Sequence, residues 1–194
     1  CPLLARTDSF GSGTVAAREV GRRVRNLANS TSWGLSIASS TLVGQALGAG
    51  EESEATAYGS QIITLAFVIH VIVAAVVIAL AEPIAAVFVD DAAAVALSAT
   101  FVAVSALSLI AMGVDGSATG ALRGAGDTQV PFYASLIGLY LFTLPVAYLG
   151  IVTQLGVTAL FVALVLETAV PSAVTLWRFN TGAWRAVSRD YRPG

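Results

Sequence analysis

Residues 60–81 read SQIITLAFVIHVIVAAVVIALA, a run that contains one histidine and no formally charged side chain. An α-helix rises about 1.5 Å per residue, so about 20 mostly apolar residues are needed to cross the hydrocarbon core of a bilayer. The run meets this requirement for both length and composition. It therefore predicts a transmembrane helix, and this prediction decides the fold class.

Four other stretches extend the pattern along the chain. Residues 92–114 and 130–153 are uncharged, and residues 155–177 contain a single glutamate. Residues 31–49 are also uncharged but rich in Ser, Thr, Gly and Gln, which suits a helix in a bundle interior or a cavity wall. The chain is therefore expected to be an all-α, polytopic transmembrane helix bundle.

The composition agrees with this class. The residues are 56% hydrophobic and 11% charged, with a mean hydropathy of +0.80, whereas soluble domains carry about 25% charged residues. The formal net charge of −2 argues against a nucleic-acid partner, because phosphate neutralisation needs a basic surface. The single cysteine, Cys1, excludes an internal disulfide and a cysteine-based metal cluster. The expected partner is the lipid bilayer, and no metal site is predicted.

Residues 14–29, TVAAREVGRRVRNLAN, are short for a membrane span and carry several charges. Arg18, Arg22 and Arg25 fall on one face of a helix, which makes the segment amphipathic. We interpret it as an interfacial or water-facing helix with solvated arginines, and a substrate-binding stripe is the alternative. Glu19 lies among the arginines and is a candidate ion-binding residue.

These assignments divide the chain into three parts. Residues 1–13 lack the basic and apolar regions of a signal peptide and are expected to be a truncated N-terminal segment. Residues 14–184 are expected to form a transmembrane lobe, followed by a cytoplasmic tail at residues 185–194. The helices of the lobe are expected at about residues 14–29, 31–49, 56–81, 92–117, 130–153 and 155–179.

The arginines also predict an orientation, because positively charged residues concentrate in cytoplasmic loops. The loops at 82–91 and 150–156 carry no positive charge, whereas Arg123 and the tail arginines lie on the other side of the predicted spans. We therefore expect a multi-pass protein of the cell membrane with a cytoplasmic C-terminus. The arginines of residues 18–25 do not fit this scheme. An inner aromatic belt is expected at Trp177, Phe179 and Trp184.

Two glycine-rich stretches interrupt the apolar sequence on the predicted cytoplasmic side. They are STLVGQALGAGEESEATAYG, residues 40–59, and TGALRGAGDTQVP, residues 119–131. A glycine just past a helix end accommodates the left-handed turn by which the chain leaves the helix, and Gly48 and Gly50 can do this in the first stretch.

The second stretch is expected to open a new helix near Pro131, with Asp127 or Thr128 as the capping residue. The residues expected to act as conformational elements of the two stretches are Gly44, Gly48, Gly50, Gly124, Gly126, Asp127 and Pro131.

Four motifs in this order resemble the C-terminal half of the MATE (multidrug and toxic compound extrusion) family. They are LVGQALGAG at 42–50, GALRGAGDTQVP at 120–131, LPVAYL at 144–149 and RFNTGAW at 178–184. The resemblance implies a six-helix lobe, helices seven to twelve, of a twelve-helix MOP-superfamily transporter. It implies export of drugs or other cationic or amphipathic small molecules in exchange for Na⁺ or H⁺ by alternating access, with a missing N-terminal lobe as partner and no cofactor.

An ionisable side chain at membrane depth is a functional candidate, because leaving it there unpaired costs at least a few kcal/mol. Asp115 follows the uncharged run 92–114. In one branch of the resembled family an acidic residue on the corresponding helix binds the coupling ion, about one turn farther from the LRG motif. The resemblance therefore implies an ion-binding role for Asp115, and a hydrogen bond to Ser117 or a helix cap is the alternative.

Further candidates lie in three other predicted spans. Glu167 precedes Pro171 by four residues, and the missing proline N–H frees a carbonyl and can bend the helix, so this segment is a candidate gate. A neutral Glu167 hydrogen-bonded to a neighbouring helix is the alternative. His70 can relay protons, or it can be a satisfied interhelical hydrogen-bonding residue. Gln45 and Gln61 are weaker candidates near the inner mouth.

The sequence offers three other interpretations. Asp115 and Gly116 begin a pattern found in CDP-alcohol-type lipid transferases, but the downstream aspartates that hold their metals are absent, so no enzyme is predicted. A lipid-linked sugar flippase of the same superfamily stays open because of Arg18, Arg22 and Arg25, and a cavity lined by arginines would favour it. A non-transporting truncated remnant is the third.

Overall fold

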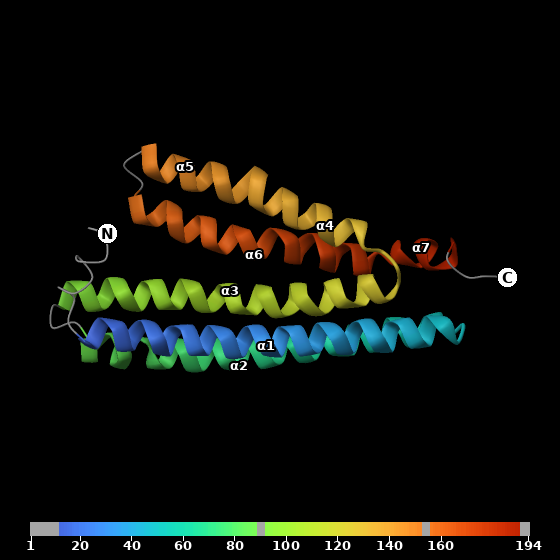
Figure 1. Cartoon of the computed structure of the whole chain (residues 1–194), viewed down its shortest axis with the longest axis horizontal. Helices are drawn as coiled ribbons and strands as arrows, with labels where there is room; N and C mark the ends of the chain where they lie inside the picture. Colours follow the sequence, from blue (N-terminus) through green and yellow to red (C-terminus); the bar gives the residue numbers. More distant parts are fainter. Residues whose placement is uncertain (1–11, 89–91, 153–155, 191–194) are drawn as a thin grey trace.

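The computed structural model describes residues 12–88, 92–152 and 156–190, and every regular element assigned within these ranges is a helix, as expected (Figure 1). The elements are α1 (Ser12–Gly48), α2 (Glu52–Phe88), α3 (Ala92–Gly124), α4 (Gln129–Leu136), the π-helix η1 (Ile137–Thr143), α5 (Leu144–Val152), α6 (Gly156–Asn180) and α7 (Trp184–Asp190). Because α4, η1 and α5 follow one another directly, the described chain forms five long rods and the short α7.

The expected division into six helices is wrong at the N-terminal end. Residues 14–29 and 31–49 were predicted as two helices, but α1 continues through them as one helix of 37 residues. Asn29 and Ser30 favour helix ends by propensity, yet both stay exposed on α1 while the neighbouring Ala28 and Ser32 are buried against other helices. Tertiary packing therefore overrides a weak local signal, and no proline is present to enforce a break.

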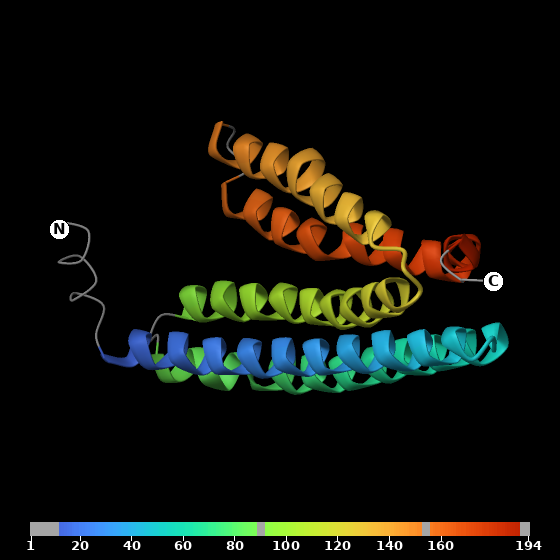
Figure 2. The same cartoon turned by 45° about the vertical axis from the view of Figure 1, so that its right-hand side comes forward.

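Helix α3 is the centre of the arrangement. It packs against α1, α2 and α6, whereas α4, η1 and α5 pack mainly against α6. Figure 2 shows the resulting two groups, α1–α3 and α4–α6, which approach each other at the α3–α4 connection and diverge towards the opposite end. The turn between α1 and α2, the α3–α4 connection and α7 all lie at the same end of the molecule (Figure 1).

The interface between α1 and α3 depends on a glycine stripe that sequence reasoning missed. A Cβ built on Gly120 would clash with the main-chain carbonyl of Ser36 on α1. The stripe repeats every four residues, so that Gly116 meets Ser32, Gly120 meets Ser36 and Gly124 meets Ser40. Small residues at this spacing let helix backbones approach closely, which is a common way to pack helices in membranes.

The outer faces of the helices are apolar. Within the part of the chain that the structure describes, two segments are long and apolar enough to cross a membrane, Glu52–Pro83 and Gln129–Val146, and they contain most of the predicted spans 60–81 and 130–153. Large side chains such as Phe67 and Ile72 are exposed on α2. Of the remaining predicted spans, 92–114 and 155–177 fall partly outside the residues whose side chains are described.

Candidate functional site

A cavity of about 310 Å³ lies between α3, α4, η1 and α6. Its two carboxylates come from different helices, Asp115 from α3 and Glu167 from α6. Among the described residues, the lining consists of Met112, Asp115, Ser135, Leu139, Glu167, Thr168 and Pro171. The structure therefore brings together the two acidic residues that the sequence singled out separately.

The wall of this cavity departs from regular α-helix on two sides. On α6, Pro171 has no N–H to donate to the carbonyl of Glu167, so this carbonyl loses its regular helix partner. On the facing rod, Gly138 of η1 is buried, and a Cβ there would lie 3.0 Å from the Pro171 ring. Thr143 Oγ1 donates to the Gly138 carbonyl at 2.9 Å. Short π-helical segments are frequent at functional sites.

Asp115 is partly buried and is held by hydroxyl groups. Thr175 Oγ1 on α6 donates to Asp115 Oδ1 at 3.0 Å, and Thr119 offers a second hydroxyl from one turn along α3. The alternative partner from the sequence analysis, Ser117, donates instead to the carbonyl oxygens of Gly113 and Val114, at 2.7 and 3.2 Å. Asp115 is therefore tied to α6 and is not occupied by a local contact with Ser117.

His70 lies away from the cavity, in the contact between α1, α2 and α3. Its side chain is fully buried, and Nδ1 lies 2.8 Å from the carbonyl oxygen of Ala66 and Nε2 3.4 Å from that of Ala28. The imidazole ring packs directly against Gly113, where the Cβ of any other residue would clash with the ring. This is the geometry of a residue that joins helices by hydrogen bonds.

The weaker candidates do not join the cavity. Gln45 is exposed near the end of α1, and Gln61 lines a separate shallow hollow on the surface of α2 with Ser60 and Thr64. The side chain of Glu19 lies outside the described residues, as do those of the neighbouring arginines.

Comparison with known proteins gives the family of this fold. The MatE family model matches residues 5–149, about three quarters of the chain. The chain belongs to the MATE family. Its members are transporters and not enzymes, so the expectation of no enzymatic activity is confirmed, as is a location in a membrane.

Relatives in bacteria and animals match most of this MATE chain. It is 30% identical over 171 residues to the "Probable multidrug resistance protein NorM" of Rhodopseudomonas palustris and 27% identical over 175 residues to that of Thermotoga maritima. These alignments cover 86% and 90% of the chain but 36% and 38% of the relatives. It is also 29% identical to the "Multidrug and toxin extrusion protein 1" of Oryctolagus cuniculus, over 75% of the chain and 26% of that protein. The chain thus spans little more than a third of its bacterial relatives.

In the two glycine-rich stretches of the MATE chain, helices α1 and α3 end in the same kind of C-terminal cap. After α1, Gly50 has φ 87° and donates to the carbonyl of Leu47, and the N–H of Glu51 donates to that of Ala46. After α3, Gly126 has φ 84° and its N–H donates to the carbonyl of Arg123. The N–H of Asp127 donates to the carbonyl of Leu122. Both are Schellman motifs, in which only glycine takes the left-handed position without strain.

The other residues predicted for these stretches have different roles. Gly48 lies within α1 and has ordinary helical φ, so Gly50 alone makes the turn. Gly44 and Gly124 face each other in the contact between α1 and α3, because a Cβ on Gly44 would lie 3.3 Å from the Gly124 oxygen. Pro131 is buried in the first turn of α4, where a missing N–H costs nothing.

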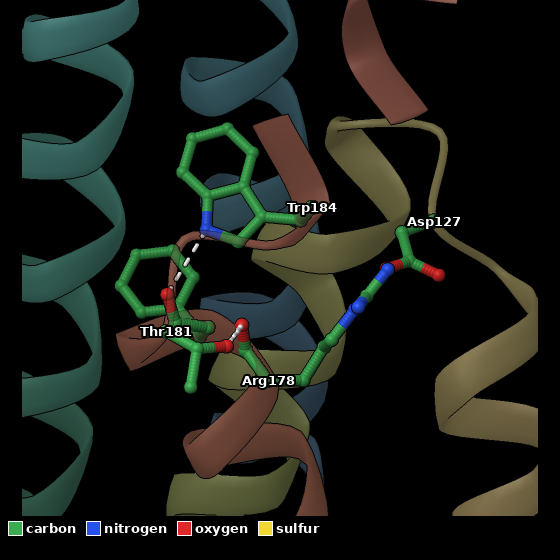
Figure 3. A network of polar contacts seen from close by, with 5 residues as sticks. Asp127, Arg178, Thr181 and Trp184 are labelled. Atoms are coloured by element: carbon green, nitrogen blue, oxygen red, sulfur yellow. Dashed lines mark hydrogen bonds and ion pairs between the residues drawn. The ribbon is translucent and has the colours of Figure 1, made fainter. Parts of the chain in front are cut away.

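Asp127 does not cap α4, contrary to one prediction, and Thr128 makes no side-chain cap hydrogen bond either. Asp127 instead accepts a hydrogen bond from Arg178 Nε of α6 at 2.8 Å, as Figure 3 shows, and its side chain is only 4% exposed. A buried carboxylate gains more from a cation than from main-chain N–H groups at an exposed helix end. The ion pair fixes the α3–α4 connection to the end of α6.

Phe179 and Trp184, which follow Arg178, are core residues. Trp184, labelled in Figure 3, is fully buried. It stacks on Phe179 at 5.7 Å between ring centroids and donates from Nε1 to the Phe179 carbonyl at 3.0 Å. Both pack into the cluster formed by α1, α2 and α3. The predicted aromatic belt is therefore wrong for Phe179 and Trp184, and of the three only Trp177 is largely exposed.

Proposed function

We propose that this chain forms one lobe of a secondary antiporter, which exports drugs or other cationic or amphipathic compounds in exchange for Na⁺ or H⁺. The observation that carries the proposal is the cavity shared by Asp115 and Glu167. The printed names of the relatives, multidrug resistance and toxin extrusion proteins, support the substrate class.

The chemistry of the cavity favours a cation. Two carboxylates in an apolar surrounding are costly unless a positive charge or a proton compensates them. Backbone carbonyls released at helix irregularities coordinate Na⁺ or H⁺ in many transporters, and the carbonyl of Glu167 is of this kind. Among the described residues that line the cavity there is no arginine, which argues against the pyrophosphate-bearing lipid of a flippase.

The arrangement of the helix ends supports alternating access. We propose that the end carrying the α1–α2 turn, the α3–α4 connection and α7 is cytoplasmic, because Arg123, Arg178 and Arg185 gather there (Figure 1). The opposite end, where the two helix groups diverge, would face outward. A second lobe, as in the longer relatives, would complete the transport path and rock against this one.

Replacing Asp115 with asparagine tests the proposal. In a full-length transporter that contains this chain as one lobe, Asp115→Asn is expected to raise the half-saturating concentration of the driving cation, or to lower cation-driven efflux, about tenfold or more. The reason is that the amide keeps the shape of the side chain but cannot balance a bound cation. Ethidium efflux from proteoliposomes, driven in turn by a Na⁺ and by a pH gradient, measures this effect.

Gln61→Ala is the matched control, because Gln61 is polar and exposed but lies away from the cavity. It should transport like the unmodified protein. Unchanged cation-driven efflux in Asp115→Asn, at equal amounts of protein in the membrane, would remove Asp115 from the mechanism and with it the proposed function of the cavity.

A further inference from the structure

Thr175 joins α3 to α6 directly beside the candidate cation site. It lies one turn after Pro171 on α6, and its side chain is 1% exposed. Its hydroxyl Oγ1 is 3.0 Å from Asp115 Oδ1 and also 2.9 Å from the carbonyl oxygen of Pro171 and 3.2 Å from that of Ser172. Thr175 is not one of the residues that line the cavity.

The hydroxyl has a choice between these acceptors, because it carries one proton. Donation to the Pro171 carbonyl is the local back-bond that a threonine in any helix can make. Donation to Asp115 links two helices, and it is charge-assisted when the carboxylate is ionised, which makes it the stronger bond. This hydroxyl makes the described hydrogen bond that reaches the Asp115 carboxylate from α6, whereas Thr119 contacts it from α3 itself.

We propose that Thr175 is a positioning residue for the coupling cation: its hydroxyl holds one oxygen of Asp115 and so orients the carboxylate for the cation in the cavity shared with Glu167. This inference rests on the cation-coupled function proposed above. An ionised carboxylate has about four acceptor positions. With the hydroxyls of Thr175 and Thr119 in place, positions remain for the cation.

The effect of losing the hydroxyl should appear in cation affinity. A carboxylate that is free to rotate must be ordered when the cation binds, and this ordering weakens binding. At saturating cation the site is filled in any case. We therefore expect a change in the half-saturating concentration and little change in the maximal rate.

Thr175→Val and Thr175→Ser form a matched pair for the experiment. Valine keeps the branched shape and removes the hydroxyl, whereas serine keeps the hydroxyl and removes the methyl group. Three single variants of the full-length transporter are made: Thr175→Val, Thr175→Ser and, for comparison, Asp115→Asn. For each variant, ethidium efflux from proteoliposomes is measured as a function of the concentration of the cation, Na⁺ or H⁺, that drives the unmodified protein.

We expect Thr175→Val to raise the half-saturating cation concentration about tenfold, with the maximal rate within about twofold, because it loses one hydrogen bond to a charged group. Thr175→Ser should restore the affinity of the unmodified protein. If valine fails to insert, Thr175→Ala removes the same hydroxyl with a strong helix former and is expected to give the same affinity loss.

The outcomes separate this inference from the function on which it rests. Unmodified affinity in Thr175→Val, while Asp115→Asn has lost cation-driven efflux, would overturn the role of Thr175 alone. Equal impairment in the valine and serine variants would also overturn it, since shape and not the hydroxyl would then matter. Normal efflux in Asp115→Asn would mean that the proposed function itself is wrong.

Discussion

Arg178→Ala is expected to destabilise the chain by roughly 3–5 kcal/mol, because it removes the only charged partner that the described structure gives to the buried carboxylate of Asp127. A buried carboxylate without its cation is costly, and it favours states in which the α3–α4 connection moves towards water. The measurement is the free energy of unfolding of the purified chain in mixed detergent micelles.

Two further variants make this experiment specific. Arg123→Ala removes an exposed arginine from the same end of the molecule and is expected to change stability by no more than about 0.5 kcal/mol. The double variant Asp127→Ala with Arg178→Ala should be less destabilised than Arg178→Ala alone, since no orphaned charge is left in it. A double variant at least as unstable as the single one would show that Arg178 acts by packing and not by charge.

Gly120→Ala is expected to destabilise the contact between α1 and α3 by roughly 1–3 kcal/mol. The added Cβ meets the backbone of Ser36, which cannot rotate away as a flexible side chain would, so the two helices must separate along the glycine stripe. The loss should appear in the same unfolding measurement in detergent.

Gly34→Ala is the control for helix propensity. Gly34 lies on α1, is exposed, and has no atom within 4 Å of the position that a Cβ would take. The same substitution there should be neutral or stabilise the chain by up to about 1 kcal/mol, because alanine is the better helix former. Equal effects at Gly34 and Gly120 would contradict the close packing of α1 on α3.

Much of the fold could be predicted because the strongest signal in the sequence is long-range hydrophobicity. The runs 60–81 and 130–153 required membrane-length helices. Each of the two glycine-rich stretches, 40–59 and 119–131, had to contain the turn that leads into one of these helices. The number of helices was harder, because Asn29 and Ser30 carry a local preference for a helix end that packing overrides in α1.

The contacts between helices could not be predicted from periodicity alone. The stripe formed by Gly116, Gly120 and Gly124 does show the four-residue spacing of close helix contacts, so this signal was present but was not used. The pair of Asp127 and Arg178 is separated by 51 positions, and no local pattern specifies it.

The candidate site shows the same division. Asp115 and Glu167 each stood out, because carboxylates are rare within apolar spans. Asp115 and Glu167 line one cavity because α3 packs on α6 and because the facing rod forms a π-helical turn at Gly138. No local sequence pattern predicts either feature. Thr175 could not be distinguished from the other threonines of the chain without its partner.

Cysteine bridging shows whether Asp115 and Glu167 share one cavity. In a Cys1→Ser background, Asp115→Cys and Glu167→Cys are introduced singly and together, and Cd²⁺ binding is measured in detergent, since thiolates bind soft cations. The double variant is expected to bind Cd²⁺ far more tightly than either single variant, because both thiols reach one ion. Binding no tighter than in the single variants, with both thiols free to react, would show that the two side chains do not share a cavity.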